Sequence, residues 1–271
     1  MKIIIKDNLV VIKGAGDLAS GVAYVLKNEG YKILMTDIHQ PTCVRRKVSF
    51  AEAVYEGEIC IQGIWGRLAK NISEVKNILQ HGDIAVIVDP HFKLIKSFNP
   101  LILVDAIMAK TNLGTKMSDA NVVIALGPGF EAGKDAHAVI ETYRSANLGE
   151  PLLNGFVAPN TGIPGKVLGY TLERLLRAPT TGTFNALLEI GDFVNKGDTV
   201  ATVAGLPILA QIGGVVRGLL RNGLQVYKEM KVGDIHPEKD SKVCSLITDK
   251  AIAVGEGVLK ALRMLEEQTV A

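Results

Sequence analysis

The hexapeptide GAGDLA at residues 14–19 decides the fold of the first half of the chain. It lies between an apolar run at 9–13 that predicts a β-strand and a helical pattern at 17–29. A G-x-G-x-x-A sequence between a strand and a helix is typical of a dinucleotide-binding turn. There, the first glycine allows the tight turn, the second lets the backbone approach a diphosphate, and the small third residue lets the helix pack on the strand. Gly14, Gly16 and Ala19 are therefore candidate ligand-binding residues.

Further apolar runs follow in the first half of the chain. Continuous Val and Ile runs, as opposed to alternating ones, indicate strands that are buried on both faces, hence a parallel sheet covered by helices. We therefore expect residues 1–150 to form a Rossmann-like, doubly wound, parallel α/β domain that binds a ligand. The predicted strands lie at 32–36, 84–88, 101–104 and 122–126.

Charged residues near the glycine turn suggest an anionic ligand. Asp37 comes 21 residues after Gly16 (37 − 16), where an acid accepts hydrogen bonds from ribose hydroxyls. Arg45 and Arg46 follow the same strand, where a 2′-phosphate or another oxyanion would bind. Asp17 argues against the binding of an anion, because its carboxylate is expected to cap the helix in the first turn and to compete with a phosphate.

Three other predicted strands end at the expected ligand edge of the sheet. Gly127 and Gly129 belong to a glycine-rich loop that follows a predicted buried strand. The segment 89–91 and Asp105 end other apolar strands, so their side chains are candidate acid–base groups. The sequence assigns no catalytic residue, and it leaves open whether the chain is an enzyme.

Residues 151–246 predict a β-rich domain, because Gly and Pro separate strand-length runs. An internal 32-residue repeat covers about 182–235, as expected when two equivalent hairpin units pack together. The turn at 191–198 resembles that of biotinyl and lipoyl carriers, which predicts a barrel-sandwich hybrid. The hairpin tip at 203–208 has no lysine, so carrier function is not expected. Residues 247–271 predict a C-terminal helix.

The composition excludes several classes of protein. Among 271 residues, 30 Lys and Arg balance 28 Asp and Glu, so no broad basic face for a nucleic acid is expected. Three dispersed cysteines and five histidines show no metal-ligand spacing, and no metal site is expected. No apolar run approaches the ~18 residues of a membrane span, and no signal peptide is evident, which favours a cytoplasmic protein. The oligomeric state is left open, a homo-oligomer included.

Several motifs are distinctive in combination. They are residues 14–19, 40–42 with 45–46 and 48–50, 105–106 with 109–110, 127–133, 159–165 and 177–179. Together these motifs resemble the YqeB family, the accessory proteins of selenium-dependent molybdenum hydroxylases. This resemblance implies a bacterial maturation factor, distantly akin to XdhC-type chaperones, whose partner is a client molybdenum hydroxylase. It assigns no catalytic residue.

The resemblance and the glycine turn together suggest a ligand. A phosphorylated pterin of the molybdenum cofactor type, or a nucleotide, would bind at Gly14, Gly16, Asp37, Arg45 and Arg46. An NAD(P)-dependent oxidoreductase acting on a small substrate is one alternative. An interaction module whose Rossmann turn is vestigial is another.

Overall fold

The computed structural model describes residues 8–144 and 147–270, which divide into two compact units. The first, here the large-sheet unit, consists of the described residues up to Pro41, of Phe50–Asn160, and of those from Ile247 onward. The second, here the double-sheet unit, consists of Thr42–Ser49 and Thr161–Leu246. This division differs from the expected one, which put 1–150, 151–246 and 247–271 in successive parts.

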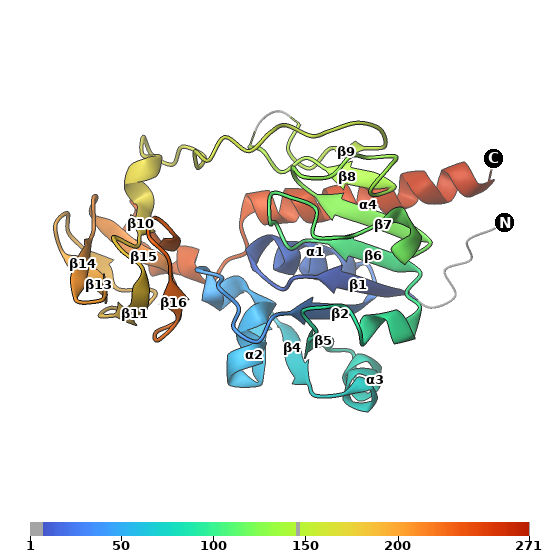
Figure 1. Cartoon of the computed structure of the whole chain (residues 1–271), viewed down its shortest axis with the longest axis horizontal. Coiled ribbons are helices and arrows are strands. Elements are labelled where there is room, and N and C mark those ends of the chain that lie inside the picture. Colours follow the sequence, from blue (N-terminus) through green and yellow to red (C-terminus); the bar gives the residue numbers. More distant parts are fainter. Residues whose placement is uncertain (1–7, 145–146, 271) are drawn as a thin grey trace. The chain divides into compact units, whose positions relative to one another are not determined.

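The large-sheet unit is built on one nine-stranded sheet of order β3-β4-β5-β2-β1-β6-β7-β8-β9 (Figure 1). Its elements are β1 (Leu9–Lys13), α1 (Asp17–Asn28), β2 (Lys32–Asp37), α2 (Ala53–Glu56), β3 (Glu58–Ile61), β4 (Ile64–Ala69), α3 (Ile72–Gln80), β5 (Ile84–Val88), β6 (Ile102–Asp105), β7 (Val122–Leu126), β8 (Ala138–Ile140), β9 (Pro151–Leu152) and α4 (Asp249–Val270).

The sheet is mixed, and the expected doubly wound parallel Rossmann fold is therefore wrong as a description of it. In the order in which they lie in the sheet, the strands from β4 through β1 to β8 pair in parallel. At the two edges, β3 is antiparallel to β4, and β9 is antiparallel to β8. The hairpin β3–β4 has a physical cause in its two-residue connection. Gln62 (φ 47°) and Gly63 (φ 87°) both have positive φ, which matches the twist of a tight hairpin.

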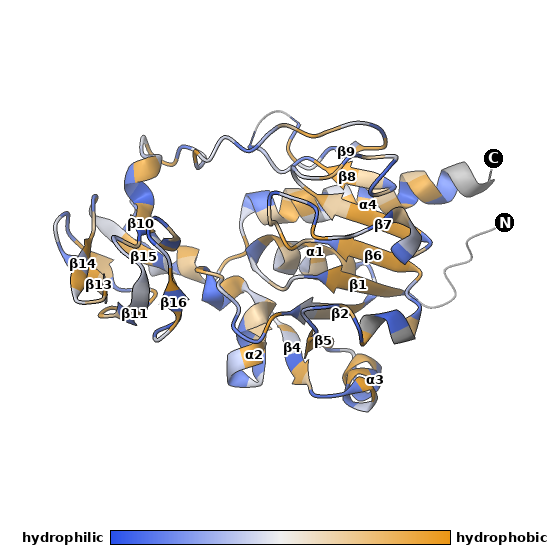
Figure 2. Cartoon of the chain, in the orientation of Figure 1, coloured by the Kyte–Doolittle hydropathy of each residue, from blue (hydrophilic) through white to orange (hydrophobic). Residues whose placement is uncertain are grey.

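One face of the sheet forms a core with α3. Val11, Leu34 and Leu103 from neighbouring strands are buried together with Val75 and Leu79 of α3. Strands β6 and β7 contribute Leu103 and Val123 to this core, and Figure 2 shows both strands as predominantly hydrophobic. Because side chains alternate along a strand, Lys13 emerges on the same face as Val11. A charged side chain therefore ends a strand that is otherwise apolar.

The C-terminal helix belongs to the large-sheet unit. Helix α4 packs against α1, and Figure 1 shows the two side by side. The approach is close: a Cβ atom on Gly21 would lie 2.5 Å from the carbonyl oxygen of Ala251. Helix α4 lies within the expected C-terminal segment 247–271, but it completes the first unit and is not a separate part.

Among the described helices, none combines the length and the apolar character that a membrane span requires.

The double-sheet unit contains two four-stranded antiparallel sheets, of order β10-β17-β15-β12 and β14-β13-β11-β16. The expected barrel-sandwich hybrid is therefore wrong. Its strands are β10 (Leu175–Arg177), β11 (Gly182–Ala186), β12 (Phe193–Val194), β13 (Thr199–Val203), β14 (Leu206–Leu209), β15 (Gly214–Leu219), β16 (Gln225–Val226) and β17 (Lys231–His236).

The 32-residue repeat is visible in this topology. Strands β11, β12 and β13 begin 32 residues before β15, β16 and β17 respectively. Each half of the repeat lends one short strand to the sheet of the other half, because β12 pairs with β15 and β16 pairs with β11. The two halves bury a shared core that includes Phe184, Val200 and Val216. The two halves of the repeat are therefore intertwined.

Candidate functional site

The carboxyl edge of the large sheet collects polar side chains. Strand β1 pairs in parallel with β2 and β6, with Lys13 opposite Thr36 on one side and Asp105 on the other. Asp37 ends β2, and Asp89 directly follows β5. Because parallel strands end at a common edge, these side chains lie where ligands of open α/β sheets bind.

The glycine turn is present, but the N–H group of Ala15 within it is already hydrogen-bonded to a side chain. Gly14 has φ 89°, and a Cβ atom there would lie 3.0 Å from the carbonyl oxygen of Ala106. The N–H of Ala15 donates to Oδ2 of Asp37 at 2.9 Å, and the N–H of Ile38 donates to Oδ1 at 2.8 Å. The Asp37 carboxylate thus holds a position that an anionic group of a ligand would need.

Burial raises the pKa of Asp37, although the two backbone N–H groups oppose this effect by stabilising the charged form. Helix α1 begins at Asp17, and its N-cap is Gly16, without a side-chain capping bond. Gly16, and not Asp17, therefore holds the N-cap position of this helix. Ala19 is buried, as the small third residue of the fingerprint requires.

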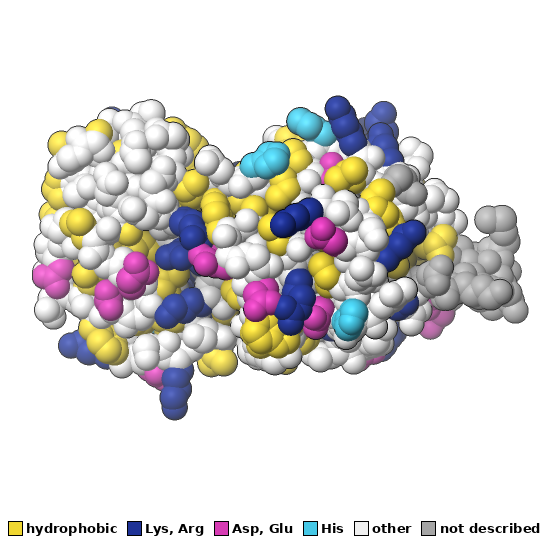
Figure 3. All heavy atoms as spheres, turned by 90° about the horizontal axis from the view of Figure 1, so that it is seen from below, with side chains coloured by type: hydrophobic (Ala, Val, Ile, Leu, Met, Phe, Trp, Pro, Cys, Tyr) yellow, Lys and Arg dark blue, Asp and Glu magenta, His cyan; other side chains and the backbone are white. Residues whose placement is uncertain are grey.

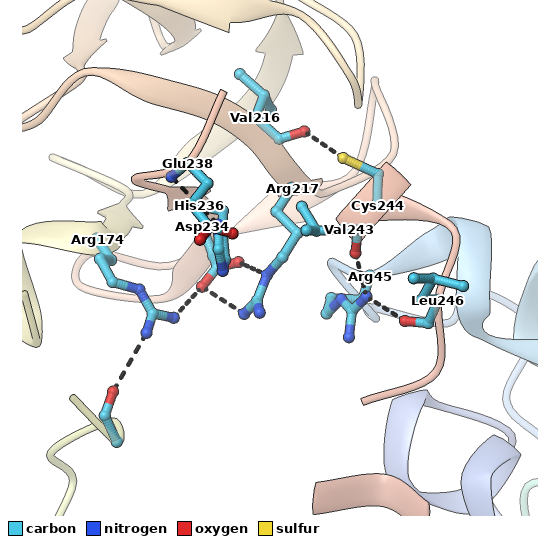
Figure 4. A network of polar contacts seen from close by, with 11 residues as sticks. Arg45, Arg174, Val216, Arg217, Asp234, His236, Glu238, Val243, Cys244 and Leu246 are labelled. Carbon is cyan, nitrogen blue, oxygen red and sulfur yellow. Dashed lines mark hydrogen bonds and ion pairs between the residues drawn. The ribbon is translucent and has the colours of Figure 1, made fainter. Parts of the chain in front are cut away.

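Arg45 and Arg46 lie in the double-sheet unit. The Nη2 atom of Arg45 donates to the carbonyl oxygens of Val243 at 3.1 Å and Leu246 at 2.9 Å (Figure 4). The Nε atom of Arg46 donates to the carbonyl oxygen of Leu219 at 2.9 Å. The two arginines bind the backbone of their own unit. With Asp37 on the Ala15 amide, the residues expected to hold a phosphorylated pterin or NAD(P) do not fit such a group.

Gly127 and Gly129 are explained by packing. Both have positive φ, 71° and 110°. A Cβ atom on Gly127 would lie 2.6 Å from Oγ1 of Thr142, and one on Gly129 would lie 2.8 Å from Cα of Thr111. Glycine at these positions therefore lets this loop pack against its neighbours.

The most distinctive side chain at the sheet edge is Lys13, which the sequence analysis missed. Only 6% of the residue is exposed. Its Nζ atom donates to Oγ1 of Thr115 at 2.6 Å, and Oγ1 of Thr115 donates to Oδ2 of Asp105 at 2.6 Å. The same Nζ atom lies 3.9 Å from the centre of the Phe92 ring. A hydroxyl thus connects a buried ammonium to a buried carboxylate.

Burial lowers the pKa of Lys13, because the charged form loses its hydration. The carboxylates of Asp105 and Asp119 act in the opposite direction, whereas the charge of Lys96 adds to the lowering. Burial outweighs the carboxylates. Lysines that are desolvated in this way occur at reactive sites, and the combination is a marker for function.

Beside Lys13 lies a cavity of about 240 Å³, here the Lys13 cavity. Phe92, Leu103 and Leu113 contribute apolar lining, and Lys13 contributes an ammonium. The other charged or ionisable lining residues are His91, Lys96 and Asp119. The lining therefore combines apolar side chains with charged and ionisable ones, and this volume suits a compound of few heavy atoms.

Two of the expected edge groups bear on the Lys13 cavity. Asp105 holds Thr115, as described, and His91 contributes to the lining. Asp89 instead shapes the following loop, since its carboxylate accepts the N–H groups of Lys93 and Leu94. The signal that would have identified Lys13 is a charged residue that ends an apolar strand at the ligand edge. Thr115 gave no such signal.

The double-sheet unit has its own buried charges (Figure 4). The Asp234 carboxylate accepts from Nη2 of Arg174 at 2.7 Å and from Nε of Arg217 at 2.7 Å. Burial alone would raise the pKa of Asp234, but Arg217, Lys231 and the arginine hydrogen bonds outweigh it, and the pKa is lowered. Arg174 also donates to the carbonyl oxygen of Gly165. This network joins β17 and β15 to residues 165–174 and is structural in character.

The surface charges are mixed in sign. On the face shown in Figure 3, Lys and Arg side chains are interspersed with Asp and Glu side chains. Such a face presents no uniform field to a polyanion. In the parts of the chain that the structure describes, no three His, Cys, Asp or Glu side chains converge as a metal site.

Comparison with known proteins gives one clear sequence relative. The chain is 47% identical over 262 residues to a protein of Escherichia coli (strain K12) described as "Uncharacterized protein YqeB". The match takes in 97% of this chain but 48% of that protein, so the chain spans about half the length of the curated relative it matches. The resemblance to YqeB is thereby confirmed for the part of that protein that the match covers. No family model matches the chain.

The structural comparisons are weak. An aspartoacylase family protein from Mesorhizobium loti is 14% identical, with 86% of each chain covered and a TM-score of 0.26. A succinylglutamate desuccinylase from Silicibacter is 12% identical, with 84% of each chain covered and a TM-score of 0.25. TM-scores this low carry no argument about the fold or function of this chain.

The expected classification as an NAD(P)-binding Rossmann protein akin to XdhC-type chaperones is corrected here. The sheet is mixed, and the N–H group of Ala15 in the glycine turn is bound by the Asp37 carboxylate. Neither comparison connects the chain with molybdenum or selenium.

Proposed function

This chain is a homologue of YqeB over about half of that protein. From this premise, we propose that the chain is an accessory protein and that it binds a small anionic compound in the Lys13 cavity. The observation that carries the proposal is the buried Lys13 ammonium at the wall of a cavity with mixed polar and apolar lining. A cation in a desolvated site attracts an anion more strongly than one in water does, because little water screens the charge.

The charges around the cavity support an anion more than a cation. Lys13 and Lys96 contribute two positive charges, against one carboxylate from Asp119. The Asp105 carboxylate lies behind Thr115, which donates to it. The apolar lining favours a compound with a short carbon skeleton.

The test is a binding measurement on the full chain with oxalate and inorganic phosphate, by calorimetry and by the shift of the melting temperature. Lys13→Met should weaken the binding of these anions by about tenfold or more, which corresponds to about 1.4 kcal/mol. The matched control is Lys32→Met, which removes an exposed lysine at the opposite end of β2 and should leave the affinity unchanged. Equal affinities for the wild type and Lys13→Met would contradict the proposal.

The second part of the proposal is that the chain assists the maturation of a client molybdenum hydroxylase. The family resemblance alone supports this part. It is tested by mixing the purified chain with a purified apo-hydroxylase and measuring complex formation by gel filtration. Separate elution at concentrations where both proteins are folded would contradict it.

An interaction module without a ligand is the alternative, and one observation favours it. The Asp37 carboxylate occupies the Ala15 amide, as expected where a nucleotide turn has lost its ligand. This alternative predicts that the client complex forms although neither oxalate nor phosphate binds the chain.

A further inference from the structure

We propose that Lys13 is a nucleophile that forms an imine with the carbonyl carbon of a small anionic aldehyde or keto acid held in the Lys13 cavity. This inference rests on the proposed function, because the compound must first bind beside Lys13. It adds a covalent step and a substrate class: a short carbonyl compound that carries a carboxylate.

The position of the Lys13 amine is the first support. Only 6% of the residue is exposed, and Lys13 contributes to the lining of a cavity of about 240 Å³. Burial also lowers the pKa of this amine, so a larger share carries a lone pair near neutral pH than in an exposed lysine. The Phe92 ring and Asp105 favour the ammonium form, but they do not outweigh the loss of hydration.

The contacts of Nζ supply a path for the proton that the amine must lose. Nζ donates to Thr115 at 2.6 Å, and Thr115 donates to Asp105 at 2.6 Å. Thr115 can accept a proton from Nζ while it passes its own hydroxyl proton to the carboxylate. Asp105 then holds the proton, and the same path returns it when the leaving oxygen needs it.

The step balances without any oxidant or reductant. The Nζ lone pair forms a C–N bond to the carbonyl carbon, and the carbonyl oxygen takes up a proton to give a carbinolamine. Loss of that hydroxyl as water, with the proton stored on Asp105, leaves a C=N bond. Overall, one ammonium and one carbonyl give one protonated imine and one water, with charge conserved.

The other charges of the cavity select the anionic group of the substrate. Lys96 contributes a cation to the lining, and His91 contributes an imidazole ring. Asp119 repels a second carboxylate near its own position. An anionic carbonyl compound therefore satisfies the cavity better than a neutral one.

The experiment uses glyoxylate, the smallest aldehyde that carries a carboxylate, on the folded full chain. The protein is mixed with glyoxylate, reduced with borohydride, digested, and analysed by peptide mass spectrometry. A reduced imine remains on the lysine as a carboxymethyl group. We expect Lys13 to be modified about tenfold faster than exposed lysines such as Lys32, because burial lowers the pKa of the Lys13 amine.

Two further measurements distinguish the outcomes. Oxalate has two carboxylates and no reactive carbonyl, so its binding reports on the proposed function alone. If oxalate binds in a Lys13-dependent manner but glyoxylate labels only exposed lysines, the imine proposal is overturned and the proposed function stands. If oxalate fails to bind and Lys13 is unmodified, both are overturned.

Thr115 is tested as a positioning residue. Thr115→Val removes the hydroxyl at nearly constant shape and should shift the pH profile of Lys13 labelling as well as slow it. Thr115→Ser keeps the hydroxyl and should restore the wild-type profile. An unchanged pH profile in Thr115→Val would show that the path through Thr115 carries no proton.

Discussion

The Nζ atom of Lys13 lies 2.6 Å from the Oγ1 atom of Thr115, although 102 positions separate the two residues in the chain. The contact joins the end of β1 to a loop beyond β6, and Asp105 at the end of β6 completes it. The chemistry proposed here depends on this contact, which places a desolvated amine at the wall of a cavity.

The burial of Lys13 predicts a pH dependence of stability. Its pKa in the folded chain lies below the ordinary value of 10.5. Between those two pKa values the unfolded chain binds more protons, so the free energy of unfolding should rise as the pH rises toward 10.5. Lys13→Met should lack this rise. Urea unfolding of both proteins between about pH 8 and about pH 10 measures it. Parallel curves would contradict the prediction.

Asp37 should matter more as an acceptor than as a charge. Asp37→Ala leaves the N–H groups of Ala15 and Ile38 without this acceptor and should cost about 1–3 kcal/mol. Asp37→Asn keeps one acceptor oxygen and removes a charge whose burial is unfavourable, so it should cost less. Because burial raises the pKa of Asp37, stability contributed by its protonated form is lost as the pH rises from 3.8 through the folded value, and Asp37→Asn should not show this loss.

Asp234 should be essential to the double-sheet unit. Its side chain is 1% exposed and neutralises Arg174 and Arg217. Asp234→Asn leaves two enclosed cations facing an amide and should cost about 3–5 kcal/mol, as is typical when one partner of a buried ion pair is removed. The matched control is Glu238→Gln, whose side chain is 53% exposed and which should change stability by less than about 1 kcal/mol. Denaturant unfolding compares them, and equal costs would contradict the prediction.

The start of helix α4 should respond to acid. Hydrogen bonds from Arg144, at 2.6 and 2.7 Å, lower the pKa of Asp249 to about 2. The stability that this pair contributes is present above 3.8 and is lost as the pH falls from 3.8 toward about 2. The effect should be small, because 74% of the Asp249 side chain is exposed.

Arg144→Gln and Asp249→Asn should each remove this acid-sensitive increment, and the double variant should remove no more than either alone. Melting temperatures recorded between about pH 5 and about pH 2 provide the measurement. Additive effects in the double variant would show that the two side chains act independently.

Much of the local structure could be predicted from the sequence. The apolar runs that end at Lys13 and Leu126 are strands, and the glycine turn lies between a strand and a helix. The repeat recurs in strands β11 to β17 at the expected spacing. The hairpin β3–β4 was missed, because its Gln-Gly connection is not among the usual turn dipeptides. Without this antiparallel hairpin, the sheet was expected to be parallel.

The candidate site was less predictable. The sequence drew attention to Arg45 and Arg46 because they follow β2, but proximity along the chain did not imply a shared site. Both donate to carbonyls of the double-sheet unit. Lys13 received no attention, because a lysine at the end of a strand ordinarily extends into solvent, and its burial depends on the loops that carry Phe92 and Thr115.

By itself, the sequence determined where strands, turns and repeats occur, because the period of apolar residues and the conformations open to glycine are local properties. Only the tertiary structure decided that residues 42–49 pack with the second unit and α4 with the first. It also decided that Lys13, Thr115 and Asp105 meet beside one cavity. Such meetings arise from long-range packing, in which burial of distant segments against each other sets the surroundings of each charge.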